Sequence, residues 1–462
     1  MNIKTLLSQI QKTSHTFDVT GLSINTQSLQ KGDIFVAIQG TQKHGAEFIQ
    51  NAIDKGCIAI LVEDRDIQCS VPSIRIDNLS SYLSDLAQTF YQEAQNIRLI
   101  GVTGPNGKTS VSFYISQILE ALNVRTGVIG TLGISHSDNK TINTTPDIFT
   151  IYKALQEYSK KGIEVAVIEA SSHALIQNRL SGLAFEQAIF TNLTQDHLDY
   201  HETMEKYREA KGKLFINSNT HTVIDNRDDE NHSYFLDVAE DKVIQTFSID
   251  DFSDYQHSKK GFICRLFDFV FELPLLGHFN LSNALAAFVS IKSLGYSDDL
   301  VIPKLSKLSP PPGRMQKLDK NNIWIDYAHT PDALSNALQT LHLHYPESKL
   351  RVVFGCGGDR DKSKREKMGK IASELAHSII LTNDNPRNEE PENIIKDILV
   401  GIKIENNTQV ILDRKIAINT AITTLNEDEV LLIAGKGHES TQIISSQALP
   451  FSDIEIALDA LI

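Results

Sequence analysis

Short apolar runs that end in glycine or polar residues, each followed by a segment with helical spacing, recur along most of the chain. From about Asn96 they follow the order strand, turn, helix, as a parallel sheet with crossover helices requires. A second series follows Gln316 and contains "WIDYAHTPD", "LRVVFGCGGDRD", "SIILTNDNPR" and "VLLIAGKGHE". Ligands of open α/β sheets bind at the carboxyl ends of the strands. The four polar strand ends therefore predict one site built from several loops.

The grouping of these patterns predicts an α/β protein with three domains. The first segment alternates short apolar runs such as "GDIFVAIQG" and "GCIAILVED" with turns and holds no obvious catalytic cluster. Three consecutive prolines in "LSPPPGRMQ" form a stiff connector and mark a second boundary. We predict a small N-terminal α/β domain (1–95), a central P-loop-like ATPase domain with a mostly parallel sheet (96–311) and a C-terminal Rossmann-like α/β domain (312–462). A length of 462 residues suits this division.

Composition narrows the class of protein. The formal net charge of -14 disfavours a broad electrostatic surface for nucleic acid or an anionic membrane. The four cysteines are too few for a disulfide scaffold and too widely spaced for a C-x-x-C pair. No apolar run approaches the roughly 18 residues that would span a bilayer. These features predict a soluble cytoplasmic protein, expected to be monomeric, without nucleic-acid or membrane partners.

The segment "LIGVTGPNGKTSVSFY", residues 99–114, predicts a phosphate-binding loop between a strand and a helix. A helix N-terminus attracts phosphate, Lys108 would reach the terminal phosphates, and the Thr109 hydroxyl could bind Mg²⁺. The loop differs from the Walker A pattern because Val102 stands where glycine is expected, and Pro105 lacks an N–H to offer. A glycine turn that merely enters a helix is the alternative interpretation.

Three further residues have a possible role near these phosphates. Glu169 ends the strand "EVAVIE" and His197 follows the apolar run "AIFTNL", so both could bind Mg²⁺, which takes a few protein ligands plus phosphate oxygens. A lone histidine after a strand is often structural. Lys211 in "EAKGK" would by default be a solvated helix lysine, and Lys213 lies close to it.

The loop "GVTGPNGKTS" resembles the G-[TS]-N-G-K-[TS] loop of the Mur ligase superfamily. Other segments match in the superfamily's order: "NTTPD", "IEASSHALIQNRL", "TNLTQDHLDYH", "YREAKGKLF", "GHFNLSNALAA", "PGRMQ", "DYAHTPDAL", "FGCGGDRDKSKR", "DNPR" and "GKGHE". The set is similar to the branch that adds the third amino acid of the peptidoglycan stem. In this superfamily ATP activates a carboxylate as an acyl phosphate, which an amine then captures to form an amide.

The resemblance implies a set of residues for ATP and its metal ions. The ATP contacts would be Gly104, Asn106, Gly107, Lys108, Thr109, Asn283, Arg314 and Asp326. Two Mg²⁺ ions would be held by Thr109, Glu169, His197 and Lys211, the last as N6-carboxylysine. Such a carbamate needs a neutral amine, so the site would have to lower the lysine pKa from about 10.4. Lys108, Lys211, His197 and Glu169 are the implied catalytic residues.

For the nucleotide-sugar substrate, UDP-N-acetylmuramoyl-L-alanyl-D-glutamate, the resemblance implies five contacts. They are Thr144, Thr145, Ser171, Gln177 and Arg179, whose hydroxyl, amide and guanidinium groups also suit a sugar diphosphate. In the N-terminal domain, "NTQ" at 25–27 and His44-Gly45 depart from the family's "DSR" and "DG". No uridine contacts are predicted for this reason.

The C-terminal motifs imply the amino acid that is added. "DNPR" has the form found in ligases that use meso-diaminopimelate, and the implied contacts are Arg360, Asp384, Asn385, Arg387, Gly435 and Glu439. An arginine pairs with the distal carboxylate of diaminopimelate but repels the ammonium of lysine. Glu439 could accept the distal ammonium. The expected function is ATP-dependent ligation of meso-diaminopimelate to the nucleotide-linked dipeptide.

Other functions remain open at this stage. A lysine-adding ligase of the same family is the nearest alternative. A folylpolyglutamate synthetase shares the ATP loop but lacks the "NTTPD", "SSHALIQNR" and "DNPR" series. A regulatory ATPase-like protein would be expected to have lost Lys108, Glu169 or Lys211, and all three are present. The general base is not predicted, and His329 is a candidate ranked no higher than a structural role.

Overall fold

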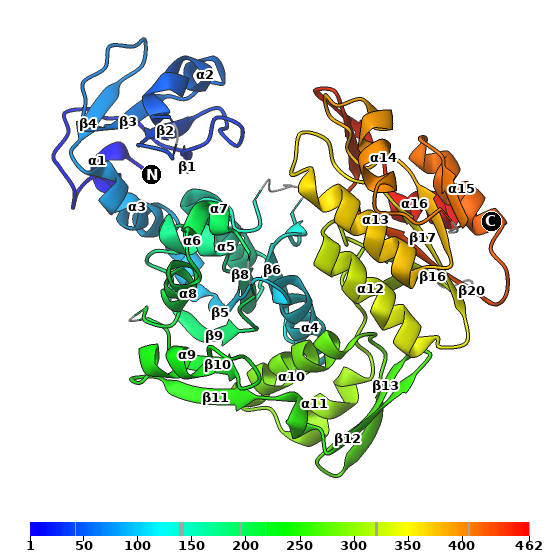
Figure 1. Cartoon of the computed structure of the whole chain (residues 1–462). Helices are drawn as coiled ribbons and strands as arrows, with labels where there is room; N and C mark the ends of the chain where they lie inside the picture. Colours follow the sequence, from blue (N-terminus) through cyan, green and yellow to red (C-terminus); the bar gives the residue numbers. More distant parts are fainter. Residues whose placement is uncertain are drawn as a thin grey trace. The chain divides into compact units, whose positions relative to one another are not determined.

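The computed structural model describes residues 1–41, 43–137, 143–194, 196–217, 219–318, 322–404 and 407–461. These residues fold into two compact units (Figure 1). The first comprises Met1–Ser248 and Ala286–Tyr296, and the second comprises Ile249–Leu285 and Ser297–Ile462. Helix α10 (His278–Ser293) contributes residues to both units.

The first unit begins with a four-stranded parallel sheet of order β1-β2-β3-β4. Its strands are β1 (Gly21–Ser23), β2 (Asp33–Ala37), β3 (Ala59–Glu63) and β4 (Ser73–Ile76), with helices α1 (Ile3–Leu6), α2 (Ile49–Asp54) and α3 (Leu83–Phe90). Alternate residues of β2 and β3 enter two cores, because a pleated strand points successive side chains to opposite faces. One of these cores continues into the larger sheet of the same unit.

That larger sheet has seven strands in the order β11-β10-β9-β5-β8-β6-β7, parallel except for the β6–β7 pair. The strands are β5 (Arg98–Thr103), β6 (Thr126–Gly130), β7 (Gly133–Ile134), β8 (Val165–Glu169), β9 (Phe185–Phe190), β10 (Thr222–Asn226) and β11 (Val243–Phe247). The helices are α4 (Lys108–Ala121), α5 (Ile148–Lys160), α6 (Ser172–Ile176), α7 (Leu198–His201), α8 (Met204–Gly212) and α9 (His232–Val238). Chain order reverses on either side of β5, so its carboxyl end is where a ligand crevice is expected.

The second unit contains an antiparallel sheet and a six-stranded sheet. The antiparallel sheet is β12 (Asp254–Ser258), β13 (Gly261–Leu266) and β14 (Phe269–Leu273). The other has the order β15-β16-β20-β17-β18-β19 and is parallel apart from β15. Its strands are β15 (Gln316–Lys317), β16 (Ile323–Asp326), β17 (Lys349–Phe354), β18 (Ser378–Leu381), β19 (Asn407–Val410) and β20 (Glu429–Ala434).

Helices cover both faces of the six-stranded sheet (Figure 1). One face packs against α12 (Pro331–His344), α13 (Ser363–Leu375) and α14 (Pro391–Leu399), and the other against α15 (Arg414–Thr423) and α16 (Asp453–Asp459). Helix α11 (Asp298–Leu305) and the hairpin of β21 (Thr441–Ile444) and β22 (Gln447–Pro450) complete the unit.

The predicted fold class is confirmed, since both large sheets are mostly parallel and carry crossover helices. The domain limits at 95/96 and 311/312 stay predictions. Among the helices of the described ranges, none is long and apolar enough to cross a membrane.

Three histidines meet in the second unit where β12, the start of α10 and the end of α12 come together. The ring centroid of His257 lies 5.0 Å from that of His278 and 5.1 Å from that of His344. His344 is buried, its Nδ1 lies 2.8 Å from the Ser258 carbonyl, and its Nε2 accepts a hydrogen bond from the Gly277 N–H. The ring must therefore be neutral, and burial lowers its pKa, with His257 and His278 adding to the effect.

Replacement of His344 by glutamine is expected to make stability less dependent on pH between about 7 and 5. A histidine whose folded pKa lies below the unfolded value of about 6.5 takes up its proton mainly on unfolding, so stability is lost as pH falls through that range. The free energy of unfolding in urea, followed across this pH range, measures the effect. The exposed His342 on the same helix is the control, and equal pH slopes for wild type and His344→Gln would contradict the expectation.

Candidate functional site

The predicted phosphate loop is a tight turn between β5 and α4. Gly104 and Gly107 have φ angles of +143° and +87°, which other residues rarely adopt. A Cβ on Gly104 would lie 1.9 Å from the Thr191 Oγ1. The Lys108 ammonium folds back over the loop and donates to the carbonyls of Gly104 (2.6 Å) and Pro105 (3.0 Å). The loop thus places a cation at the N-terminus of α4.

Residues after β9 hold this loop in place. The Thr191 hydroxyl donates to the Asn106 carbonyl (2.6 Å), and the Asn106 N–H donates to the Asn192 side chain (3.3 Å). The Asn106 amide also donates to the Thr194 hydroxyl (3.1 Å). With a further bond from the Asn192 amide to the Asn106 carbonyl (3.1 Å), Asn106 is fixed by four bonds to the neighbouring strand end, which sequence reasoning did not predict.

Gly104→Ala is expected to weaken ATP binding at least about tenfold, because the loop must move away from Thr191, and to cost about 1–3 kcal/mol of folding free energy. Isothermal titration calorimetry with ATP measures the first effect and denaturant unfolding the second. Gly295→Ala is the matched control, since Gly295 also has a positive φ (+98°) but nothing lies within 4 Å of its added Cβ. Equal ATP affinities for the two variants would show that the close contact does not matter.

Glu169, at the end of β8, is a buried carboxylate beside the loop. It is 1% exposed and accepts hydrogen bonds from the Thr109 hydroxyl (3.0 Å), the Thr131 hydroxyl (3.0 Å) and the Thr131 N–H (2.9 Å). Within the described part of the chain, no group of three or more His, Cys, Asp or Glu side chains is arranged to hold a metal ion. A hydroxyl and one carboxylate nevertheless fit Mg²⁺, because that ion keeps several waters and phosphate oxygens in its shell.

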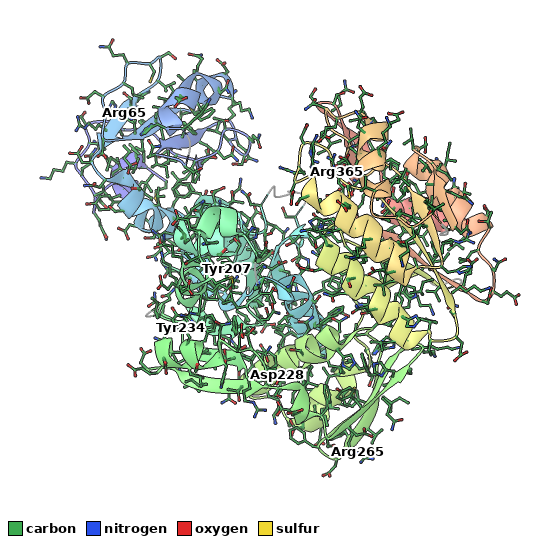
Figure 2. The ribbon with its side chains drawn as sticks, viewed as in Figure 1. Arg65, Tyr207, Asp228, Tyr234, Arg265 and Arg365 are labelled. Atoms are coloured by element: carbon green, nitrogen blue, oxygen red, sulfur yellow. The ribbon has the colours of Figure 1, made fainter. Side chains whose placement is uncertain are left out.

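His197 and Lys211 lie in the same unit. The His197 side chain is 48% exposed, 3.5 Å from the Asp196 carboxylate, and its ring lies edge-on to His173. Lys211 on α8 is buried, with its ammonium 4.3 Å from the ring centre of Tyr207, which is labelled in Figure 2. Burial lowers the pKa of Lys211 well below its usual value, and the charge of Lys108 lowers it further. The interpretation of Lys211 as a solvated helix lysine is therefore wrong, whereas Lys213 is exposed.

The predicted nucleotide-sugar contacts form one hydrogen-bonded network at the end of β8. The Thr145 hydroxyl donates to the Glu169 carbonyl (2.6 Å) and accepts from the Ser171 N–H (3.0 Å). Arg179 donates to the Thr145 carbonyl (2.6 Å) and, through Nε and Nη2, to Gln177. The Thr131 hydroxyl lies 3.3 Å from that of Thr144 and joins the network to Glu169.

Three of the predicted ATP contacts, Asn283, Arg314 and Asp326, lie in the second unit. Asp326, at the end of β16, accepts from the Met315 N–H (2.6 Å), and burial raises its pKa while Arg314 opposes the rise. The Arg314 guanidinium carbon lies 4.7 Å from the ring centre of Tyr327. The structure brings Arg314 and Asp326 together. Asn283, buried on α10, donates instead to Asn280 (3.3 Å).

The predicted amino-acid contacts gather at the carboxyl ends of β17, β18 and β20. The Asn385 amide donates to the Glu439 carboxylate (3.1 Å), and Arg387 donates to the Gly358 carbonyl (2.8 Å). Asp384 is buried, which raises its pKa, and a Cβ on Gly435 would lie 2.8 Å from its carboxylate. Arg360 is exposed. A Cβ on Gly357 would lie 2.9 Å from Arg387 Nη1 and 3.7 Å from Arg360 Cγ, so both arginines flank this glycine.

Two buried arginines that sequence reasoning missed hold these loops. Arg365, labelled in Figure 2, pairs with both carboxylate oxygens of Glu389 at 3.0 Å and donates to the Gly357 carbonyl, and the pairing lowers the pKa of Glu389 to about 2. Arg414 pairs with Asp453 (2.7 and 2.8 Å) and donates to the Ala434 carbonyl. The charged run "DRDKSKR" contains Arg365 but reads equally well as a solvated helix start.

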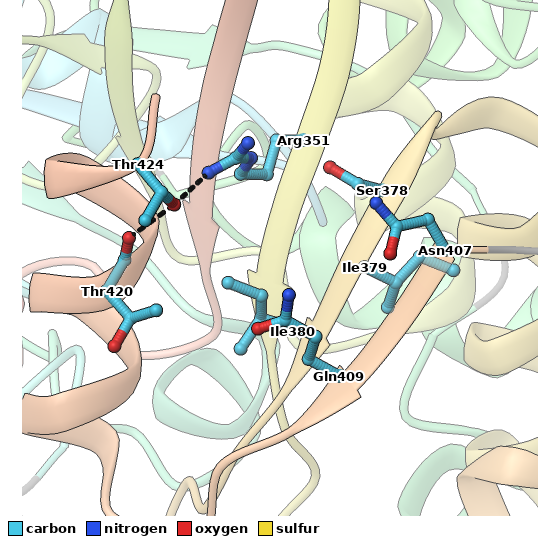
Figure 3. A pocket seen from close by; sticks show the side chains of 8 residues that line it. All are labelled: Arg351, Ser378, Ile379, Ile380, Asn407, Gln409, Thr420 and Thr424. Atoms are coloured by element: carbon cyan, nitrogen blue, oxygen red, sulfur yellow. Dashed lines mark hydrogen bonds between the residues drawn. The ribbon is translucent and has the colours of Figure 1, made fainter. Parts of the chain in front are cut away.

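A cavity of about 180 Å³ also lies in the second unit (Figure 3). Its lining comes from β17, β18 and β19 and from α15 with the residue that follows it: Arg351, Ser378, Ile379, Ile380, Asn407, Gln409, Thr420 and Thr424. Arg351 donates to the Thr424 hydroxyl (2.7 Å) and to Glu429 (2.7 Å). None of the predicted site residues is among these lining residues.

The phosphate loop, the buried carboxylate and the two parallel-sheet units together define a nucleotide-dependent enzyme of the α/β class. Three family models match the chain: the Mur ligase family catalytic domain at residues 18–91, the Mur ligase middle domain at 102–291 and the Mur ligase glutamate ligase domain at 313–437. The chain belongs to the Mur ligase family and is an ATP-dependent ligase.

Known proteins resemble the chain over its whole length. The UDP-N-acetylmuramoyl-L-alanyl-D-glutamate--2,6-diaminopimelate ligase of Coxiella burnetii is 40% identical, with 96% of each chain covered. A solved structure of a ligase of the same name has a TM-score of 0.70 and 32% identity and covers 100% of this chain and 99% of its own. The MurF ligase of Thermotoga maritima in complex with ADP has a TM-score of 0.63, with 96% and 97% covered, and at 20% identity it shares the fold alone.

Proposed function

We propose that the protein joins meso-2,6-diaminopimelate to UDP-N-acetylmuramoyl-L-alanyl-D-glutamate and converts ATP to ADP and phosphate, in the synthesis of peptidoglycan precursors. The observation that carries the proposal is the full-length similarity to ligases of that name, at 40% identity for the Coxiella burnetii protein. Asn385, Arg387 and Glu439 cluster at one sheet edge, which agrees with the proposal. Arg387 can pair with the distal carboxylate of diaminopimelate, and Glu439 can pair with its distal ammonium.

The phosphate loop supports a role for Lys108 in binding the ATP phosphates. Its ammonium donates hydrogen bonds to two loop carbonyls in this structure. We infer that it turns to the terminal phosphate when ATP binds. Arg314 suits the nucleotide phosphates by charge, the Asp326 carboxyl group can form hydrogen bonds with hydroxyl or amino groups of the nucleotide, and Asn283 supplies an amide for the base. The missing N–H of Pro105 leaves one donor fewer in the cradle than a Walker A loop offers.

Mg²⁺ would be held by Thr109, Glu169, His197 and the carbamate of Lys211, where it would neutralise charge that develops on the phosphates. The buried Glu169 and the lowered pKa of Lys211 support this assignment. The Thr109 hydroxyl already donates to Glu169, so both groups point to the same place.

The reaction follows in two chemical steps. The side-chain carboxylate of D-glutamate attacks the γ-phosphorus of ATP and forms an acyl phosphate and ADP, while Lys108 balances the charge of the phosphate. The amine of diaminopimelate then attacks the acyl carbon, and collapse of the tetrahedral intermediate releases phosphate. The network of Thr145, Ser171 and Arg179 would hold the nucleotide-sugar so that its carboxylate meets the phosphate.

An oxygen-transfer experiment tests this proposal. Substrate whose D-glutamate side-chain carboxylate carries ¹⁸O at both oxygens is incubated with ATP, Mg²⁺, diaminopimelate and the protein. One ¹⁸O per released phosphate and a tripeptide product in the mass spectrum are expected, because the acyl–oxygen bond breaks when the amine attacks. Tripeptide formation with release of unlabelled phosphate would contradict the acyl-phosphate route.

Three finer features remain part of the proposal. Arg387 disfavours specificity for lysine. Lysine has no distal carboxylate to pair with the guanidinium, and its side-chain ammonium would be repelled. A cytoplasmic location agrees with the free cysteines Cys57, Cys69, Cys264 and Cys356. The monomeric state stays a prediction.

A further inference from the structure

Lys436 is a buried lysine at the centre of the proposed diaminopimelate contacts. It follows β20 in "GKGHE" and is 0% exposed. Its ammonium donates to the Glu439 carboxylate (2.7 Å) and to the Asn385 side-chain oxygen (3.0 Å), and it lies 4.0 Å from the Asp384 carboxylate. One ammonium thus joins two of the three loops that carry the proposed contacts, those after β18 and β20.

The backbone around Lys436 is shaped for this position. Gly435 and Gly437 on either side have φ angles of +118° and +53°. The Asn385 oxygen that accepts from Lys436 also accepts from the Ile443 N–H (2.8 Å), so its amide nitrogen is turned toward Glu439. Lys436 therefore orients both polar groups of this pair.

Charge gives Lys436 a second role. Asp384 and Glu439 are two carboxylates, Lys436 supplies one ammonium, and the nearby Arg414 is already paired with Asp453. One negative charge is left over, which matches the single distal ammonium of diaminopimelate, while Arg387 is available for the distal carboxylate. Without Lys436 the same place would carry two unbalanced carboxylates and favour additional cations.

We propose that Lys436 is a positioning and specificity-determining residue, which orients Asn385 and Glu439 for the diaminopimelate ammonium and limits the site to one such charge. This inference rests on the proposed function. It adds a residue that the sequence analysis did not include among the contacts.

Lys436→Met and Lys436→Gln test the inference in the full-length protein. The KM for diaminopimelate is expected to rise at least about tenfold in both, with the KM for ATP changed less than about twofold, since the hydrogen bonds of Lys436 go to Asn385 and Glu439 among the proposed amino-acid contacts. Lys436→Gln keeps a donor but no charge. Both variants are expected to narrow the preference for diaminopimelate over L-lysine in kcat/KM, because the carboxylates of Asp384 and Glu439 lose the ammonium that balances them.

The controls separate the possible failures. Lys415→Met, at an exposed lysine in the same unit, is expected to leave all constants unchanged, and ATP binding by calorimetry reports whether each variant folds. A wild-type protein that does not use diaminopimelate would overturn the proposed function itself. A wild type that does use it, with variants whose KM for diaminopimelate and amino-acid preference are unaltered, would overturn only the role of Lys436. If Lys436→Met fails to fold, Lys436→Gln decides.

Discussion

Replacement of Lys211 by alanine is expected to lower kcat about a hundred- to a thousandfold, the range found when one group that stabilises charge at a reacting centre is removed. The physical reason is the environment of the amine. Burial and the charge of Lys108 lower its pKa, so a larger neutral fraction is available near pH 7 to attack CO₂. In the proposed carbamoylation this attack would form an N–C bond and release one proton, and Lys211 would become an anion able to hold Mg²⁺. Release of phosphate by the purified variant with all substrates present measures the effect.

Two further observations bear on the Lys211 result. Acetate or formate should restore part of the activity of Lys211→Ala, because a small carboxylate can occupy the space of the carbamate. Lys213→Ala is the control, since Lys213 is exposed and two residues away. A failed rescue together with an unmodified lysine in the native mass spectrum would rule out the carbamate.

Arg387→Ala is expected to raise the KM for diaminopimelate by about a hundredfold, the loss of a charge-assisted pair with the distal carboxylate. The KM for ATP should remain within about twofold, because the loss is confined to the amino-acid contacts. Arg387 has a φ of +53° and donates to the Gly358 carbonyl, so its side chain is held next to Gly357. Steady-state kinetics with each substrate varied in turn measures both constants.

The Arg387 result has its own control. Arg387→Lys should recover little of the affinity, because an ammonium lacks the fork that pairs with a carboxylate. Equal losses for diaminopimelate and ATP would mean that the amino-acid pocket is misplaced.

The parallel sheets could be predicted from the sequence because strands buried on both faces appear as continuous apolar runs between helices. The antiparallel sheet β12–β14 was not predicted. Its segments "GFICRL" and "FVFEL" alternate buried and exposed residues, a period-two signal that a search for apolar runs overlooks. The predicted phosphate loop was recognisable because its glycines and G-K-T are adjacent in the chain.

The supporting residues of the site could not be predicted in the same way. Their partners are far away in the sequence. Arg365 and Glu389 are separated by 24 residues, Arg414 and Asp453 by 39, and Lys436 and Asn385 by 51. A single sequence does not reveal such partners. A charged residue is therefore expected to be exposed to solvent. Lys211 was predicted only through the family resemblance, because its burial depends on how α8 packs.

The most direct test of the central claim is the ratio of kcat/KM for meso-diaminopimelate to that for L-lysine, measured with ATP, Mg²⁺ and UDP-N-acetylmuramoyl-L-alanyl-D-glutamate. The ligase described here should favour diaminopimelate by at least about a hundredfold, since a site with paired charged groups rejects an analogue that lacks one of them. A ratio near one, or turnover with lysine alone, would contradict the specificity assigned to Arg387 and Glu439.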